Sequence, residues 1–358
     1  MKERYYNLDN LLKCDCRWNI LYGMRSNGKS YAVKRHVILD AYKHGNHFVY
    51  LRRWSEDIKE KDVRSYFDDM PIDKLTDGEW EYIHTFRGYF YFAKGSGDDM
   101  EKSEPIGRYC ALNLYERYKS QTFPRVKTII YEEFLTNRIY LGGNGENSEP
   151  RILMQFVSTV ARDRDIDIFL IGNTISRVCP YFTEWGLKGV MQQKPGTIDI
   201  YHLRGENGVV DIAVENCEVV ETKSKMFFGL ASKQITSGEW EVDDVPKLLK
   251  PYAFYEMLYE IDVVFNEFKY VMQLLFDSES GGCFVYIYPN TKGRKIRRVI
   301  TDVFNVDPLI TNGLMSKIPA EAVIADCFRK SKVCYSDNLT GTDFKNVLKQ
   351  YDFKGVIL

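Results

Sequence analysis

A glycine-rich stretch between an apolar run and an amphipathic run most constrains how this chain folds. It reads G-x-x-x-x-G-K-S from Gly23 to Ser30, follows an apolar run at 18–22 and leads into a predicted helix over 30–43. Glycines let successive backbone amides turn inward, where they and a helix N-terminus bind phosphate. In such a loop Lys29 reaches the β- and γ-phosphates and Ser30 holds Mg²⁺. The alternative is a plain strand–turn–helix junction.

The residues of this loop expected to bind a nucleotide share its backbone turn. They are Gly23, Arg25, Ser26, Asn27, Gly28, Lys29 and Ser30.

Apolar runs alternate with amphipathic stretches through the first half of the chain. Strands are predicted at 18–22, 47–51, 108–114, 126–131 and 166–171, a hairpin at 80–93, and helices at 30–43, 55–76 and 151–164. Strands that alternate with helices predict an α/β fold with a doubly wound, mostly parallel sheet. Beyond about residue 195 the strands alternate as exposed strands do, and an aromatic, β-rich region follows. We therefore expect a first domain over 1–200, a linker or edge region over 201–250 and a smaller α+β domain over 251–358.

Two carboxylates follow one of the apolar runs. In VKTIIYEEF, Glu132 and Glu133 end the predicted strand, with Glu132 expected beside the metal and Glu133 as the general base that polarises water. The alternative is a solvated strand end. Asn173 follows the next apolar strand, IDIFLIGN, where it is expected to contact the γ-phosphate or the water; the alternative is a turn cap.

Two arginines end the amphipathic helix before that strand. Arg162 or Arg164 is a candidate arginine finger that acts in a neighbouring subunit, which would require a dimer or a ring. Cations also favour a helix C-terminus without any catalytic role, so the structural interpretation stays open.

The composition limits the possible partners and compartments. The net charge of -1 gives no global basic field, so nucleic-acid binding has to use local patches. Eight cysteines without a CxxC pair predict free thiols rather than a zinc site. The first residues are polar, and no apolar run approaches the roughly 18 residues of a membrane span. We expect a reduced, cytosolic protein without a membrane partner.

Five stretches of this sequence carry a family resemblance. They are NILYGMRSNGKSYAVK, HFVYLRRW, YKSQTFPRVKTIIYEEF, STVARDRDIDIFLIGNT and RVCPYF, in order over much of residues 18–182. On these residues the chain resembles the DNA-packaging ATPases of phi29-like tailed phages, which are similar to the FtsK/HerA-type ring motors of the ASCE class of P-loop NTPases. The resemblance implies hydrolysis of ATP with Mg²⁺ and movement of double-stranded DNA into an empty capsid.

The resemblance also implies an assembly and a location. The expected partners are further copies of this chain in a homomeric ring, which the resemblance implies is a pentamer, the portal of the procapsid, and a scaffold RNA in some members. The expected place is the host cytoplasm, at the portal vertex.

Individual residues take roles from the resemblance. Lys29, Ser30 and Asn173 match nucleotide-site residues and Glu133 the catalytic base. Arg162 matches the finger that acts across the subunit boundary, Lys119 a lysine offered across the same boundary, and Arg53 a basic residue near the nucleotide. One departure is Glu132, where the pattern usually has Asp. The loop at 136–149 has no assigned role.

The family's second domain is similar to an RNase H-like nuclease fold without its catalytic acids. Here Asp277 ends a β-run, but no acidic trio accompanies it. The basic stretch NTKGRKIRR, 290–298, is predicted to contact DNA phosphates without reading sequence. The alternative is a charged edge that deters strand pairing. The five basic residues in that stretch are Lys292, Arg294, Lys295, Arg297 and Arg298.

Two rival functions stay open at this point. One is a terminase-like ATPase that also cuts DNA with an active C-terminal nuclease. The other is a nucleotide-binding assembly adaptor that does not hydrolyse ATP.

Overall fold

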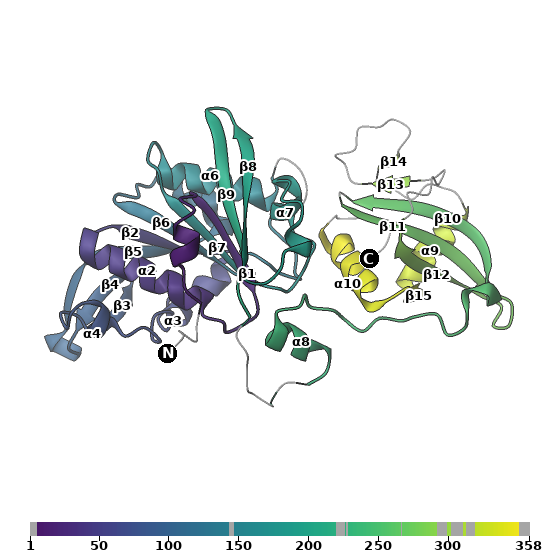
Figure 1. Ribbon diagram of the computed structural model, residues 1–358, viewed down its shortest axis with the longest axis horizontal. Helices are drawn as coiled ribbons and strands as arrows, with labels where there is room; N and C mark the ends of the chain where they lie inside the picture. The colour runs from purple at the N-terminus through teal and green to yellow at the C-terminus, as the bar shows by residue number, and fades with distance from the viewer. Residues whose placement is uncertain are drawn as a thin grey trace. The chain divides into compact units, whose positions relative to one another are not determined.

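The chain forms two compact units, which Figure 1 displays as a ribbon. The computed structural model describes residues 6–142, 147–219, 226, 228–265, 267–291, 299–301, 311–312 and 319–350. Each unit is built from three separate segments of the chain. Unit 1 comprises Met1–Thr136, Glu149–Ile175 and Glu184–Trp240, and unit 2 comprises Asn137–Ser148, Ser176–Thr183 and Glu241–Leu358.

Unit 1 is built on a nine-stranded sheet with the order β3-β4-β5-β2-β6-β7-β1-β9-β8. The six neighbours from β5 to β9 in this order run parallel, and antiparallel strands extend both edges. The predicted α/β fold with a mostly parallel sheet is therefore confirmed. The strands are β1 (Trp18–Gly23), β2 (His47–Arg52), β3 (Tyr82–Phe86), β4 (Tyr89–Lys94), β5 (Glu101–Ala111), β6 (Val126–Glu132), β7 (Asp167–Asn173), β8 (Thr197–Gly205) and β9 (Gly208–Asn216).

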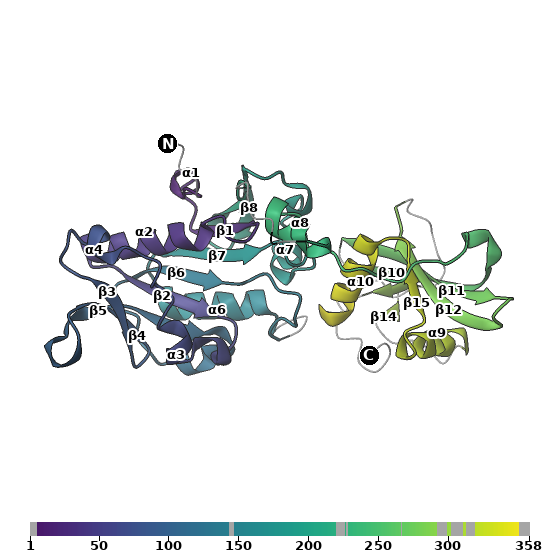
Figure 2. The same cartoon turned by 90° about the horizontal axis from the view of Figure 1, so that it is seen from below.

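Two long helices cover opposite faces of this sheet. Figure 2 shows α2 (Lys29–His44) on one side of the strands and α6 (Glu149–Ala161) on the other. The shorter helices of unit 1 are α1 (Asp9–Leu12), α3 (Glu60–Val63), α4 (Ile72–Leu75), α5 (Tyr115–Tyr118) and α8 (Leu230–Ser237), whereas α7 (Pro180–Glu184) belongs to unit 2 up to Thr183. Turns of 3-10 helix lie at Ser55–Ile58, Gly97–Asp99, Leu112–Leu114, Val190–Gln192 and Tyr252–Phe254.

The long helix predicted over 55–76 is wrong. This segment forms the turn Ser55–Ile58 and the one-turn helices α3 and α4. Pro71 interrupts the stretch, and proline lacks the amide that a continuing helix needs. The aromatic side chain of Phe67 points into the core, with its ring centroid 5.6 Å from that of Phe48.

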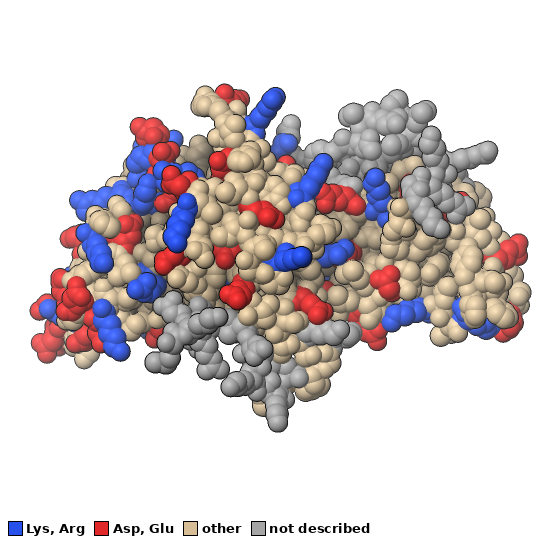
Figure 3. All heavy atoms as spheres, viewed as in Figure 1, with Lys and Arg blue, Asp and Glu red and all other residues tan. Residues whose placement is uncertain are grey.

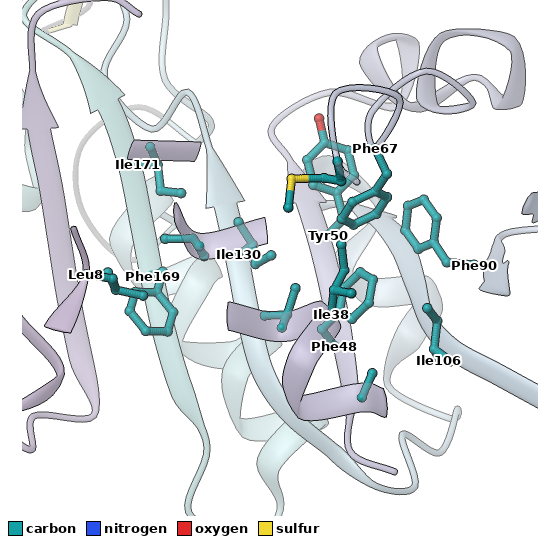
Figure 4. Packing of buried hydrophobic residues seen from close by; sticks show 14 of the residues in the cluster. Leu8, Ile38, Phe48, Tyr50, Phe67, Phe90, Ile106, Ile130, Phe169 and Ile171 are labelled. Atoms are coloured by element: carbon teal, nitrogen blue, oxygen red, sulfur yellow. The ribbon is translucent and has the colours of Figure 1, made fainter. Parts of the chain in front are cut away.

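The core under α2 is rich in aromatic rings. Figure 4 shows Phe48, Phe67 and Phe90 packed together, with Ile130 and Phe169 on the neighbouring strands. Rings of Phe48 and Phe90 stack at 5.4 Å, which ties the β3–β4 hairpin to the parallel strands. This core fixes the strand ends on which the functional residues lie.

The first unit extends further along the chain than the sequence predicted. Strand β9 pairs with β1 within the parallel part of the sheet, from Trp18 beside Ile212 to Tyr22 beside Asn216. The first unit therefore ends at Trp240 rather than near residue 200. The sequence pattern is typical of exposed strands because β8 has no buried residue and β9 is buried only over its second half.

Unit 2 contains a six-stranded sheet with the order β14-β13-β10-β11-β12-β15. Its central strands β10, β11 and β12 are antiparallel, and the turn at 278–281 joins the last two. This sheet agrees with the expected β-rich second domain. The elements are β10 (Glu256–Phe265), β11 (Phe268–Asp277), β12 (Gly282–Pro289), β13 (Val299–Thr301), β14 (Thr311–Asn312), β15 (Val333–Tyr335), α9 (Pro319–Arg329) and α10 (Asn338–Gln350).

The loop that received no role from the sequence belongs to unit 2. Lys349 and Gln350, at the end of α10, donate hydrogen bonds to the carbonyls of Asn137 and Arg138 at 3.3 and 3.0 Å. The ring of Tyr140 meets Tyr181 edge-on at 6.4 Å. The chain thus leaves β6, enters unit 2 and returns to unit 1 at Glu149.

Charges are mixed over the surface. On the face in Figure 3, acidic and basic side chains of the described residues are interspersed and form no single basic field. Within the same described part of the chain, no helix has the length and apolar character that crossing a bilayer requires.

Candidate active site

The predicted phosphate-binding loop turns through three left-handed positions. Gly23, Ser26 and Gly28 have φ angles of 148°, 59° and 99°. Gly28 is the residue before α2, so the first amides of that helix face the loop. A Cβ on Gly23 would lie 3.3 Å from the carbonyl oxygen of Cys217, so this position also needs glycine for space. The backbone has the curl that an anion site requires.

Lys29 points its ammonium group into this loop. The side chain is only 4% exposed, and Nζ donates to the Met24 carbonyl at 2.6 Å, to Asn27 Oδ1 at 3.1 Å and to Asn173 Oδ1 at 3.4 Å. Burial lowers the pKa of the Lys29 ammonium, and the negative charge of Glu132 opposes that shift. A phosphate anion in the loop would favour the charged form further.

Glu132 lies at the end of β6, beside the start of α2. The Tyr66 hydroxyl donates to its Oε1 at 3.1 Å, and the Ser30 hydroxyl donates a second hydrogen bond. Burial raises the pKa of the Glu132 carboxyl, and these two hydrogen bonds work in the opposite direction. The carboxylate and the serine hydroxyl are therefore adjacent oxygen donors.

These donors fit Mg²⁺, which prefers hard oxygen ligands and keeps several waters. Among the residues that the structure describes, no three His, Cys, Asp or Glu side chains gather as an all-protein metal cage. A site completed by water and phosphate oxygens agrees with that donor set.

Glu133 has an unusual backbone and one strong partner. Its φ angle of 58° lies in the left-handed region, which costs a non-glycine residue about 1–2 kcal/mol. Its Oε2 accepts a hydrogen bond from Arg52 Nη2 at 2.6 Å, and its side chain is 58% exposed. The carboxylate is accessible, and the backbone that carries it is held in a strained conformation.

Asn173 lies between the loop and the carboxylates. Strand β7 runs between β1 and β6, with Asn173 beside Gly23 and Ile171 beside Glu132. The carboxyl ends of the three parallel strands therefore meet at one edge of the sheet. This strand order brings the side chains into reach of one another.

One cavity of about 720 Å³ joins these groups. That volume lies within the usual range of about 300–1,000 Å³ for small-molecule sites. Its lining includes loop residues 25–30 together with Glu132, Glu133 and Asn173. The structure thus brings together nearly every residue that the motifs predicted.

Two contributors were missed by the sequence. Asp69 lines the cavity and pairs with Lys34 of α2, and Tyr66 bonds to Glu132. Both lie in the segment 55–76, for which the sequence predicts a helix. No motif marks them, because only the fold of residues 60–75 brings them to the site.

Arg53 is placed differently from the expectation. It does not line the cavity; it is only 6% exposed, and Nε donates to Glu149 Oε2 at 2.7 Å. Further hydrogen bonds go to the carbonyls of Glu133 and Phe134. This placement corrects the expectation of a nucleotide contact, because the guanidinium is committed to protein oxygens behind the Glu133 backbone.

Lys119 and Arg162 lie away from the cavity of their own chain. Lys119 is exposed and pairs with Glu116 at 2.7 Å, while Arg162 is exposed and donates to the Gln121 carbonyl at 3.4 Å. Because that carbonyl is two residues from Lys119, the two cations share one region of the surface. Arg164 instead donates to the carbonyls of Phe123, Val126 and Val160. Arg164 therefore secures the fold, and Arg162 is the more available candidate finger.

Unit 2 contains two further features that the sequence marked, Asp277 and the basic residues between 292 and 298. Asp277 Oδ1 accepts the Glu279 amide at 3.1 Å and lies 3.8 Å from the Lys250 ammonium, as a turn residue does. In the described part of the chain it belongs to no acidic cluster. The predicted DNA contacts Lys292, Arg294, Lys295, Arg297 and Arg298 lie outside the described residues.

A segment near the end of unit 1 crosses the phosphate-binding loop. A Cβ on Gly238 would lie 3.2 Å from the Met24 amide nitrogen, and the Trp240 ring stacks on Tyr22 at 5.5 Å. Thr174, next to Asn173, donates to the Glu239 carbonyl at 3.1 Å. The last residues of unit 1 therefore contact both the loop and the tip of β7.

The Gly238→Ala substitution is expected to displace the backbone at Met24 and so to weaken nucleotide binding roughly fivefold. This change in affinity corresponds to about 1 kcal/mol of binding free energy. Titration with a fluorescent ADP analogue measures this. Gly229→Ala is the matched control, since Gly229 has nearly the same φ (72° against 71°) but nothing within 4 Å of an added Cβ. Equal affinities in the two variants would show that the contact with Met24 is irrelevant.

Known proteins share this architecture and part of the sequence. The model of a family described as Podovirus DNA encapsidation protein (Gp16) matches residues 1–268. A DNA packaging protein of Bacillus phage B103 is 30% identical over 178 residues, which are 49% of this chain and 50% of that protein. Its counterpart in Bacillus phage phi29 is 28% identical over 187 residues, or 52% and 51%. The chain spans about half the length of the curated relatives it matches.

One solved structure is similar over nearly the whole chain. The bacteriophage Phi-29 viral genome packaging motor assembly aligns with a TM-score of 0.55 and 20% identity, and covers 98% of this chain and 100% of the matched chain. At this identity the likeness concerns the fold alone.

Proposed function

Because this chain belongs to the Podovirus DNA encapsidation protein (Gp16) family, we propose that it is an ATP-hydrolysing motor that moves double-stranded viral DNA into a procapsid. The observation that carries the proposal is the single cavity lined by Lys29, Ser30, Glu132, Glu133 and Asn173. Phosphoryl transfer depends mainly on positioning and charge stabilisation, and these residues supply both.

Each residue of the cavity has a distinct task in hydrolysis. The loop amides and Lys29 bind the β- and γ-phosphates of ATP, which fixes the reacting phosphorus against the end of β6. Ser30 and Glu132 would hold Mg²⁺, which when bound neutralises part of the phosphate charge. Glu133 accepts the proton of the attacking water. Asn173, within 3.4 Å of Lys29 Nζ, hydrogen-bonds the water or the γ-phosphate.

The assembly we propose is a homomeric ring, five-membered as the family resemblance implies, at the portal of a procapsid in the host cytoplasm. The exposed pair Lys119 and Arg162 supports a composite site, because neither cation lines the cavity of its own chain. The basic residues between 292 and 298 contact DNA phosphates, and a ring adds such weak contacts together. The family resemblance adds a scaffold RNA to the proposed partners.

Phosphate release with and without double-stranded DNA tests the proposal. We expect steady release by the chain with portal-bearing shells, stimulated by DNA and reduced to background by Lys29→Ala. Lys29 is buried and its ammonium donates to three oxygen atoms around the loop, so its loss should affect the loop directly. Lys13 is an exposed lysine outside the loop, and the control substitution Lys13→Ala should leave phosphate release unchanged. A wild-type chain that binds ATP without steady release would favour the assembly adaptor instead.

A further inference from the structure

A buried ion pair lies behind the backbone of the candidate catalytic base. Arg53 follows β2, Glu149 begins α6, and the two side chains are 7% and 0% exposed. Two hydrogen bonds join them, Nε to Oε2 at 2.7 Å and Nη2 to Oε1 at 3.0 Å. Such a two-point arginine–carboxylate contact fixes orientation as well as distance.

The same guanidinium also holds the chain directly after β6. Arg53 Nη1 donates to the Glu133 carbonyl at 3.1 Å, and Nη2 donates to the Phe134 carbonyl at 2.7 Å. Glu133 is a left-handed residue with a φ angle of 58°. A conformation of this kind persists where surrounding contacts over-determine it. The two hydrogen bonds from Arg53 are such contacts, and they act on the carbonyls of Glu133 and the residue after it.

A third side chain completes the arrangement. The Tyr131 hydroxyl donates to Glu149 Oε1 at 2.6 Å, and the Arg53 guanidinium lies 5.9 Å from the centroid of the Tyr131 ring. The carboxylate of Glu149 also lies at the N-terminus of α6, where a negative charge is favourable. The ends of β2 and β6 and the start of α6 are thereby joined at one point.

Stability alone is a weak reason for this pair. A buried ion pair often contributes little compared with apolar side chains of similar size. What apolar side chains cannot replace is the set of donors directed at the two carbonyls. We propose that Arg53 and Glu149 form a positioning clamp that holds the backbone of Glu133, so that its carboxylate stays at the cavity. This inference rests on the proposed ATP hydrolysis and adds a role for two residues outside the cavity.

Arg53→Lys tests the clamp, because lysine keeps the charge but cannot bond to both carboxylate oxygens and both carbonyls. A misplacement of about 1 Å can cost about 10²-fold in rate, so kcat is expected to fall roughly 10- to 100-fold. The loop residues that bind ATP are untouched, so KM and ADP affinity should change less than about threefold. Arg151→Lys, an exposed arginine in the first turn of the same helix, is the matched control and should behave as wild type.

Tyr131→Phe provides a milder second variant if Arg53→Lys folds poorly. It removes one hydrogen bond to Glu149 and keeps the ring, so we expect kcat to fall about threefold with unchanged ADP affinity. Rates are divided by the number of sites that bind labelled ADP, which removes the effect of unfolded protein.

The outcomes separate the clamp from the other possibilities. Wild-type kcat per site in both variants would overturn the clamp, and so would a parallel loss of ADP affinity in Arg53→Lys, which indicates a nucleotide contact. No phosphate release by the wild-type chain would instead remove the proposed hydrolysis itself, before any variant is compared.

Discussion

Glu133→Gln is expected to lower the rate of phosphate release by about 10²–10⁴-fold, the range that a positioned general base contributes. Glutamine has the same shape as glutamate but cannot accept the proton of the attacking water. The loop amides, Lys29 and Ser30 are unchanged, so the variant should still bind ATP and retain it. Single-turnover release of labelled phosphate measures the rate, and filter retention of ATP measures the binding.

Loss of stability is a poor alternative explanation for such a result. The Glu133 side chain is 58% exposed, and glutamine keeps a side-chain oxygen that can accept the hydrogen bond from Arg52. The midpoint of thermal unfolding should therefore shift by only a few degrees. Glu101→Gln is the matched control, because Glu101 is also an exposed glutamate paired with a cation, Lys94 at 3.0 Å. If both variants release phosphate at the wild-type rate, Glu133 is not the base.

The motifs could be predicted because each follows a buried apolar strand. Gly23, Glu132 and Asn173 end β1, β6 and β7, and the carboxyl ends of parallel strands converge at one edge. Local pattern therefore sufficed to place the loop, the carboxylates and the asparagine in one cavity. The resemblance to phi29-like packaging ATPases, drawn from the same stretches, is confirmed by the family match over residues 1–268.

What the sequence could not supply depends on contacts between distant segments. Glu149 lies 96 residues from Arg53, and nothing in either stretch shows that they pair. The resemblance put Arg53 near the nucleotide, whereas the fold turns its guanidinium to the carbonyls behind Glu133. Asp69 lines the cavity because residues 60–75 do not form the expected continuous helix, and the packing of Phe67 on Phe48 is a tertiary contact that local pattern does not show.

The division into units was also beyond local pattern. Residues 137–148 follow Glu132 and Glu133 in the chain and 176–183 follow Asn173, yet both segments fold with unit 2. A search for domain boundaries along the sequence finds one linker. It cannot show that two earlier segments leave unit 1, fold with unit 2 and return. The chain therefore leaves unit 1 directly after each of the two strands whose tips line the cavity.

A site shared between neighbouring subunits, as proposed, would give the second large effect. Arg162 is exposed and Lys119 lies in the same surface region, so neither cation reaches the cavity of its own chain. If Arg162 acts in a neighbour, Arg162→Ala is expected to lower phosphate release by about 10³–10⁵-fold, the contribution of an arginine finger. ADP binding to the isolated chain should be unaffected, because the finger contacts phosphate only across the boundary.

Mixing two inactive variants distinguishes a finger that acts in a neighbour from one that acts within its own chain. A Glu133→Gln subunit can donate Arg162, and an Arg162→Ala subunit keeps Glu133, so neighbours in the correct order form a complete site. In a random one-to-one mixture about one quarter of the sites are complete, and we expect about that fraction of wild-type release if sites act independently. The control replaces the donor with the double variant Glu133→Gln/Arg162→Ala, which offers no finger and should restore nothing. Equal release in the two mixtures, or full activity of Arg162→Ala alone, would exclude Arg162 as a shared residue and leave Lys119 as the cation to test.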